Sequence, residues 1–179
     1  MIPPKVVCEI TQDQIQARVR ELASEISKWN GTEPLVAIGV LKSGFVFFSD
    51  LVRRLNFPVR CEFITIASTE TAETRSGELI LTLDTATHVA GNHVLLIDDI
   101  INTGLTMAYL VRLLKSRGAK AVRACALGAK TKKSVIPLPI DYLGFELDDR
   151  CFVGYGMDYC GYFRELPFIG TTHHESNSY

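Results

Sequence analysis

The stretch Val94–Met107, VLLIDDIINTGLTM, places an apolar run, two carboxylates, a short turn and a helical pattern in direct succession. A continuously apolar run is typical of a strand that is covered on both faces of a parallel sheet. Asp98 and Asp99 end this run, and the turn Asn102–Thr106 leads into the helix. In parallel sheets, ligands bind beyond the carboxyl ends of the strands. The stretch therefore predicts an α/β fold with a binding site at this turn.

The chemistry of this turn favours a phosphorylated ligand. Successive backbone N–H groups and the positive end of the following helix form an anion site. The two adjacent carboxylates would repel a bare phosphate, so they favour a molecule with a phosphate at one end and hydroxyl groups or Mg²⁺ close by. A sugar phosphate has this character, and phosphoribosyl pyrophosphate (PRPP) fits it best. The alternative is an ordinary strand-to-helix turn with a capped helix, since Thr and Asp are common caps.

The remainder of the chain alternates strands and helices. A capping-box pattern at Thr11 and Gln14 precedes apolar residues at helical spacing, which predicts a helix over residues 11–29. Helices are also predicted over residues 45–55 and 106–117. Strands are predicted over residues 35–41, 59–67, 78–83, 93–98, 121–129, 142–145 and 152–155, and residues 161–179 are predicted to be mostly irregular. This alternation predicts a twisted, mainly parallel β-sheet flanked by helices.

Length and charge limit the classes of function. The chain has 179 residues, which is the length of one domain with a substantial core. Its formal net charge of −1 argues against nucleic-acid binding and against a polybasic membrane anchor. No apolar run reaches transmembrane length, and there is no signal-peptide pattern. The five cysteines are odd in number and form no CxxC pair, which indicates reduced thiols in a cytoplasmic protein.

Three further polar segments follow predicted strands and are expected at the same edge of the sheet. Lys42, Ser43 and Gly44 combine a cation with small residues that let the backbone approach an anion, although a turn with a solvated lysine is the alternative. Residues 68–77, STETAETRSG, have little to bury and predict a mobile loop, with a plain polar surface loop as the alternative. Lys130 ends a strand, where it either donates to a purine carbonyl oxygen or is solvated like its lysine neighbours.

In order along the chain, these segments resemble type I phosphoribosyltransferases and, within that class, the hypoxanthine-guanine phosphoribosyltransferase family. The resemblance rests on LKSGFVFFSD at 41–50, VLLIDDIINTGLTM at 94–107, GAKTKK at 128–133, CFVGYGMD at 151–158 and YFREL at 162–166. It implies a type I phosphoribosyltransferase fold in a single domain over residues 1–179, with a core over about 34–135 and a small hood from about 1–10 and 140–179. It also implies a flexible catalytic loop over residues 68–77, and a homodimer or homotetramer.

The resemblance implies transfer of 5-phosphoribosyl from PRPP to hypoxanthine or guanine in purine salvage, with Mg²⁺ as cofactor. The residues that it assigns to PRPP are Lys42, Ser43, Gly44, Asp98, Asp99, Asn102, Thr103, Gly104, Leu105, Thr106 and Arg164. Those assigned to the purine are Lys130, Cys151, Phe152, Val153 and Asp158, with Lys130 selecting 6-oxopurines. The implied Mg²⁺ ligands are Asp158, Asp98 and Asp99, and the implied catalytic positions are Asn102, Lys42 and Arg164. The Leu41–Lys42 peptide bond is implied to be cis.

Three positions depart from the family pattern. Asn102 stands where the family has an aspartate that exchanges a proton with purine N7, and an amide cannot act as a base near neutral pH. Cys151 stands where an aromatic ring usually stacks on the purine, and Ser68–Thr69 replaces the usual Ser-Tyr pair. These departures keep two alternatives open: a transferase for another base, and a catalytically weak regulator that binds PRPP or a nucleotide.

Overall fold

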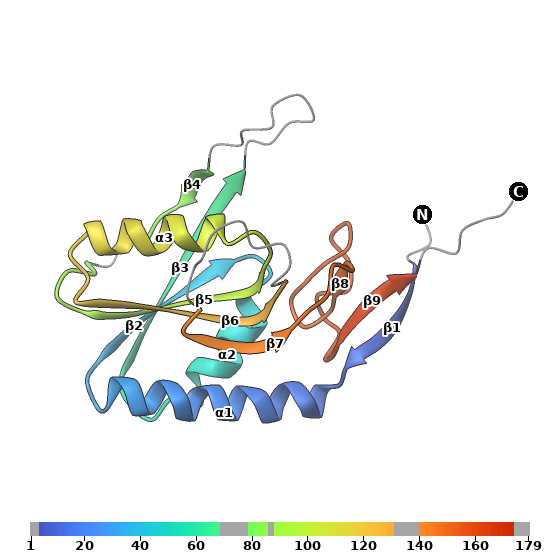
Figure 1. Ribbon diagram of the computed structural model, residues 1–179, viewed down its shortest axis with the longest axis horizontal. Coiled ribbons are helices and arrows are strands. Elements are labelled where there is room, and N and C mark those ends of the chain that lie inside the picture. The colour runs from blue at the N-terminus through green and yellow to red at the C-terminus, as the bar shows by residue number, and fades with distance from the viewer. Residues whose placement is uncertain (1–3, 69–78, 86–87, 131–139, 174–179) are drawn as a thin grey trace, which may run out of the picture.

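The computed structural model describes residues 4–68, 79–85, 88–130 and 140–173, and within these ranges it contains a large sheet, a small sheet and flanking helices (Figure 1). The helices are α1 (Gln12–Asn30), α2 (Phe45–Val52) and α3 (Leu105–Ser116). The strands are β1 (Lys5–Ile10), β2 (Leu35–Leu41), β3 (Val59–Ser68), β4 (Leu79–Leu83), β5 (His93–Ile101), β6 (Ala121–Ala129), β7 (Tyr142–Glu146), β8 (Phe152–Val153) and β9 (Ile169–His173).

The large sheet has the strand order β4-β3-β2-β5-β6-β7. Strands β3, β2, β5, β6 and β7 run parallel, and only β4 pairs antiparallel, with β3, at the edge. In Figure 1, α1 and α2 lie below this sheet and α3 lies above it. The prediction of an α/β fold with a mainly parallel sheet is therefore confirmed.

Burial on both faces explains why the central strands are continuously apolar. One core layer lies between the sheet and α1 and α2, and a second lies between the sheet and α3. The helix α1 buries Ile15, Val19 and Leu22 completely at helical spacing. Its predicted capping box is present, since Gln14 N donates to Thr11 Oγ1 at 3.3 Å and Thr11 N donates to Gln14 Oε1 at 2.8 Å.

The small sheet contains two strands that were not predicted, β1 near the N-terminus and β9 near the C-terminus. The strand β1 pairs antiparallel with β9, which pairs with β8. Apart from β9, the described part of residues 161–179 is irregular, as predicted. Neither β1 nor β9 was predicted as a strand, because each is short and is stabilised by a partner far away in the sequence. Ser68 belongs to β3, and the remainder of the predicted loop, residues 69–77, lies outside the described residues.

The strand registers bring the predicted site segments to one edge of the large sheet. Leu41, the last residue of β2, is level with Thr65 of β3, and Ile101 at the end of β5 is level with Ala129 of β6. The strand β5 continues three residues beyond the predicted end at residue 98, to Ile101, so Asp98 and Asp99 lie inside the strand. The carboxylates are therefore held by ladder hydrogen bonds rather than by a loop.

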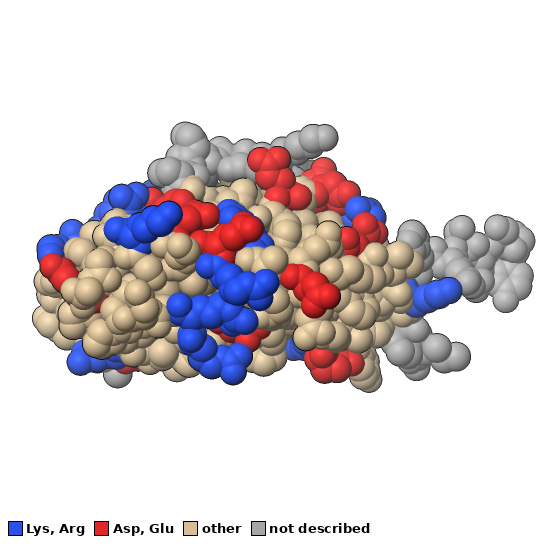
Figure 2. All heavy atoms as spheres, turned by 90° about the horizontal axis from the view of Figure 1, so that it is seen from below, with Lys and Arg blue, Asp and Glu red and all other residues tan. Residues whose placement is uncertain are grey.

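The outer face of α1 carries charges of both signs. Figure 2 shows this face, where a short band of Lys and Arg side chains is bordered by Asp and Glu. At the border of this face, the partly buried Arg18 joins α1 to β7, since it pairs with Glu21 at 2.8 Å and donates to the Leu143 carbonyl oxygen at 2.7 Å. In the ranges that the structure describes, no helix has the length and apolarity to cross a bilayer.

Candidate active site

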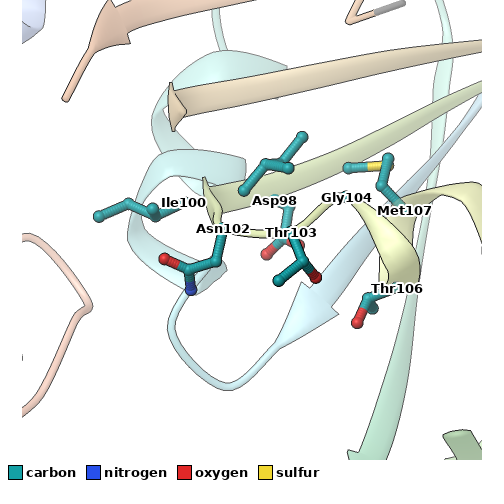
Figure 3. A pocket seen from close by; sticks show the side chains of 8 residues that line it. Asp98, Ile100, Asn102, Thr103, Gly104, Thr106 and Met107 are labelled. Carbon is teal, nitrogen blue, oxygen red and sulfur yellow. The ribbon is translucent and has the colours of Figure 1, made fainter. Parts of the chain in front are cut away.

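The turn after β5 encloses a hollow of about 170 Å³ at the N-terminus of α3 (Figure 3). The residues that line it are Asp98, Ile100, Ile101, Asn102, Thr103, Gly104, Thr106 and Met107. In Figure 3, Asn102 and Thr106 lie at opposite ends of the turn, with Thr103 between them. Gly104 precedes the helix with φ +83°, a conformation that favours glycine. Hydroxyl groups, backbone N–H groups and the helix dipole thus meet where a phosphate group fits.

The carboxylates Asp98 and Asp99 are close neighbours in a poorly solvated place. Asp99 is only 7% exposed, and its backbone N–H donates to Asp98 Oδ1 at 2.9 Å. Burial, together with the charge of Asp99, raises the pKa of Asp98 well above its ordinary value. Two carboxylates held this close favour a ligand that brings a cation or hydroxyl donors between them and the solvent.

The loop after β2 packs directly against this pair. The Leu41–Lys42 peptide bond is cis, as the resemblance implies. A Cβ atom on Gly44 would lie 2.7 Å from the Val40 carbonyl oxygen and 3.6 Å from Asp99 N, so only glycine fits there. Lys42 is exposed at the tip of the loop. The loop therefore packs its backbone at Gly44 against the carboxylate pair and exposes the Lys42 side chain to solvent.

A second hollow of about 260 Å³ adjoins the first. Its lining consists of Ser43, Asp99, Ile100, Asn102, Lys130, Cys151, Phe152, Met157 and Asp158. Ile100 and Asn102 belong to both hollows. Asn102 thus borders both the turn at the start of α3 and a chamber that is lined by apolar side chains, two carboxylates and one lysine.

Several predicted site residues lie outside these two linings. Val153 is fully buried and is level with Gly170 in the small sheet, so its side chain does not line the chamber. Leu105 is half-exposed at the start of α3, where its N–H lies 3.5 Å from Thr103 Oγ1. Conversely, Ile100 and Met157 line the chamber and were not predicted. Both lie inside the matched motifs, but an apolar residue type gives no chemical signal of a ligand.

The third part of the site is the loop that follows β8. Arg164 Nη2 lies 2.7 Å from Asp158 Oδ1, and Arg164 Nη1 donates to the Gly156 carbonyl oxygen at 2.7 Å. Asp158 Oδ2 accepts from Gly161 N at 2.7 Å. Gly156 has φ +101°, and a Cβ atom there would lie 2.2 Å from the Ser43 carbonyl oxygen. The loop is therefore closed by its own ion pair and seated on the segment after β2.

The predicted Mg²⁺ ligands lie on two segments, β5 and the loop after β8, and one residue from each segment, Asp99 and Asp158, lines the second hollow. Nowhere in the described ranges do three or more His, Cys, Asp or Glu side chains gather into one metal-binding group. Asp158 is engaged by Arg164, whereas Asp98 and Asp99 lie together on β5. Mg²⁺ commonly takes one or two carboxylates and completes its shell with phosphate oxygens and water. The carboxylates of β5, or Asp158 of the loop after β8, are therefore enough for one ion.

This architecture, with a turn rich in anion donors at the carboxyl end of a central parallel strand, suits a phosphorylated ligand. The chain matches the family model of the phosphoribosyl transferase domain over residues 9–159 and belongs to that family. It is 38% identical to the hypoxanthine-guanine phosphoribosyltransferase of Bacillus subtilis, over 90% of this chain and 89% of that protein. It is also 38% identical to the hypoxanthine-guanine-xanthine phosphoribosyltransferase of Tritrichomonas foetus, over 89% of this chain and 87% of that protein.

A solved structure agrees with these relatives. The crystal structure of a hypoxanthine-guanine phosphoribosyltransferase from Bacillus anthracis superposes with a TM-score of 0.89 at 34% identity, over 96% of this chain and 99% of that chain. The predicted resemblance to hypoxanthine-guanine phosphoribosyltransferases is therefore confirmed, together with the predicted fold class.

Proposed function

We propose that the protein is a purine salvage enzyme that transfers 5-phosphoribosyl from PRPP to hypoxanthine or guanine, giving IMP or GMP and pyrophosphate. The observation that carries this proposal is the position of Asn102, which lines both the phosphate-binding turn and the chamber that holds Lys130. A sugar phosphate in the first hollow would present its anomeric carbon to a base in the second. The relatives that are named as transferases of these bases support the same reaction.

The turn after β5 holds the 5′-phosphate in this proposal. Its donors are the backbone N–H groups at the start of α3 and the hydroxyl groups of Thr103 and Thr106. Asp98 and Asp99 accept hydrogen bonds from the ribose hydroxyls, directly or through a cation. Because both carboxylates are fixed in a strand, they orient the ribose without the entropic cost of ordering a loop.

The leaving pyrophosphate lies between the loop after β2 and the loop after β8. Lys42 supplies a flexible point charge, and Arg164 supplies a planar fork that suits a diphosphate. The reaction develops positive charge on the anomeric carbon and negative charge on the pyrophosphate, so cations held near the leaving group favour the transition state. Water must be excluded from this carbon. We assign that task to residues 68–77, most of which lie outside the described residues.

Mg²⁺ is the cofactor that the residues fit. Asp98 and Asp99 would hold one ion at the ribose and diphosphate, and Asp158 would hold another at the diphosphate. Mg²⁺ would neutralise charge on the leaving group. The close pairing of Asp98 with the buried Asp99 is the observation that supports this assignment, because burial and the charge of Asp99 raise the pKa of Asp98, and a divalent cation would offset both effects.

The base is recognised through Lys130, which donates to the oxygen at position 6 of a 6-oxopurine. A 6-amino group would present donors to the same ammonium and would be rejected. Asn102 donates to purine N7 and positions the ring, but it supplies no base catalysis. Proton transfer by a general base is typically worth about 10²- to 10⁴-fold, so we expect slow turnover from this site.

We also propose a cytoplasmic homodimer or homotetramer that binds neither nucleic acid nor membranes. Five free cysteines agree with a reducing compartment. Phe45 on α2 and Phe63 on β3 are exposed, and large exposed aromatic side chains suit a contact between subunits. The mixed charges of Figure 2 give no continuous basic surface on that face for a phosphate backbone.

The decisive experiment incubates the protein with Mg²⁺, PRPP and a panel of bases beside an Asn102→Asp variant. We expect conversion of hypoxanthine or guanine, with a kcat about 10²-fold higher in the variant because a general base has been added. Turnover of another base alone would replace the proposed substrate. If ligands bind and neither protein turns over any base, the regulator alternative replaces the enzyme.

A further inference from the structure

Lys130 is held at the wall of the base chamber by unusually specific contacts for a lysine. Its backbone N–H donates to the Ile101 carbonyl oxygen at 2.9 Å, which fixes the Cα position at the end of β6. Its Nζ donates to the Arg150 carbonyl oxygen at 2.9 Å. Since an ammonium group has three N–H donors, two remain for a ligand in the chamber.

The second contact of this ammonium is an aromatic ring. Lys130 Nζ lies 5.8 Å from the centroid of the Phe152 ring, and Arg150 Cζ lies 5.8 Å from the same centroid. Phe152 is only 7% exposed, so its ring is fixed by packing. The negative face of an aromatic ring attracts a cation within about 6 Å, and the attraction grows where water is excluded.

The other cation on this ring is itself anchored by carboxylates. The guanidinium of Arg150 pairs with Glu9 at 2.5 Å and with Asp148 at 2.8 Å. Glu9 also accepts from Thr171 Oγ1 at 2.9 Å, which ties Arg150 to the small sheet. The Arg150 backbone that accepts from Lys130 is therefore held in place by these pairs, and the Phe152 ring contacts both the anchored Arg150 and Lys130.

We propose that Phe152 is a positioning residue that holds the Lys130 ammonium in the base chamber, and that it thereby sets the preference for 6-oxopurines over 6-aminopurines. The preference rests on the proposed function, since Lys130 discriminates only if a purine binds there. Phe152 does not replace the stacking ring that Cys151 lacks. Both cations lie within 5.8 Å of its ring centroid, and we infer that it acts on the base through Lys130.

The physical reason is the freedom of a lysine side chain. Without the ring, one hydrogen bond to a backbone carbonyl would have to hold four methylene groups and a strongly hydrated charge, which favours rotamers that reach solvent. An ammonium group that samples several rotamers still adds positive charge near the chamber. It no longer distinguishes an acceptor at position 6 from a donor, because that distinction depends on a fixed direction.

The kinetic test is a cycle of Phe152→Leu and Lys130→Gln, with Phe152→Tyr as the variant that keeps a ring. We expect Phe152→Leu to raise the KM for hypoxanthine roughly three- to tenfold, with kcat and the KM for PRPP little changed. The ratio of kcat/KM for hypoxanthine to that for adenine should fall by the same factor, and Phe152→Tyr should restore it. In the Lys130→Gln background, Phe152→Leu should have no further effect. Equal effects in both backgrounds, or no effect in either, would overturn the proposal.

A spectroscopic test separates this inference from the proposed function. Lysines are reductively methylated with [¹³C]formaldehyde and a borohydride reductant, and the Lys130 signal is identified by its loss in Lys130→Gln. A methylated ammonium over the Phe152 ring should be shifted upfield in the unmutated protein and should lose that shift in Phe152→Leu. An unshifted Lys130 signal overturns the positioning role, whatever the turnover. A shifted signal in a protein that converts no purine supports the positioning role and overturns the proposed function alone.

Discussion

Arg164 and Asp158 form an ion pair of 2.7 Å at the mouth of the candidate active site, and the same guanidinium donates to the Gly156 carbonyl oxygen. A single arginine, Arg164, therefore cross-links the loop that follows β8. A diphosphate that binds to Arg164 must use the donors that this pair leaves free. Alternatively, it must draw Asp158 toward a bound cation.

Arg164→Gln should weaken PRPP binding more than base binding. The variant removes the charge and the bond to Gly156, and charge-assisted hydrogen bonds contribute about 1.5–3 kcal/mol each. We expect the KM for PRPP to rise by about tenfold or more, while the KM for the base changes less. Initial rates over a matrix of both substrates measure the two constants. Lys120→Gln is the matched control, because Lys120 pairs with Glu33 at the opposite edge of the sheet. An equal rise in both constants would contradict a specific role for Arg164.

Gly156→Ala and Gly161→Ala separate backbone strain from a steric clash. Both glycines have a positive φ, +101° and +88°, so an alanine at either costs about 1–2 kcal/mol. Only at position 156 would the new Cβ meet a neighbour, the Ser43 carbonyl oxygen at 2.2 Å, whereas position 161 is open. We expect a larger loss of thermal stability for Gly156→Ala, because the clash adds to the backbone strain, and a fall in kcat/KM of up to about 10²-fold for this variant alone, because the loops move apart. Equal kinetics would show that the seating of this loop on Ser43 is dispensable.

The local half of the fold could be predicted from the sequence. The capping box at Thr11 acts within one turn of helix, and the apolar run into Asp98 requires a strand buried on both faces wherever it occurs. Gly104 could be placed at the turn because the helix after it needs a backbone that glycine adopts readily. Signals of this kind depend on neighbours in sequence, so they survive without knowledge of the rest of the chain.

The non-local half could not be predicted. The strands β1 and β9 form because they pair with each other, although they lie near opposite ends of the sequence. Neither has a residue pattern that predicts a strand without its partner. The pairing of Asp158 with Arg164 was missed for a related reason, since residue types assign ligands one at a time. The two cations on Phe152 depend on the meeting of β6 with β8, which no spacing in the sequence encodes.

Asp50→Asn should make the free energy of unfolding less dependent on pH in the acidic range. Burial disfavours the charged form of Asp50, but hydrogen bonds from Tyr155, Gln16 and Arg53 outweigh it and keep the pKa of this carboxyl below its ordinary value. A folded-state pKa below the unfolded one stabilises the fold above about pH 4, and this contribution is lost as the pH falls through the folded-state pKa. We therefore expect Asp50→Asn to cost about 1–3 kcal/mol near pH 7 and progressively less below about pH 4.

Urea unfolding at a series of pH values measures this dependence. Tyr155→Phe removes only the hydroxyl that donates to Asp50 Oδ2 at 2.7 Å and should show a smaller loss with the same pH profile. Ser49→Ala, exposed on the same helix, is the control and should be close to neutral at every pH. A constant difference between the Asp50→Asn variant and the unmutated protein from pH 7 to pH 3 would show that the carboxylate charge is not the stabilising element.

Cys151→Phe should tighten base binding, because Cys151 is exposed and lines the chamber beside Lys130. A ring at this position can lie on the face of a purine, and stacking of a base on an aromatic side chain is worth about 1–3 kcal/mol. We expect the KM for hypoxanthine or guanine to fall by about five- to a hundredfold, with the KM for PRPP unchanged. Cys8→Phe, at another exposed cysteine on β1 outside the chamber, controls for added apolar surface. If Cys151→Phe instead raises the KM for the base, the Phe152 ring and its two cations already fill the space that a second ring would need. The purine would then bind against Met157, which also lines the chamber.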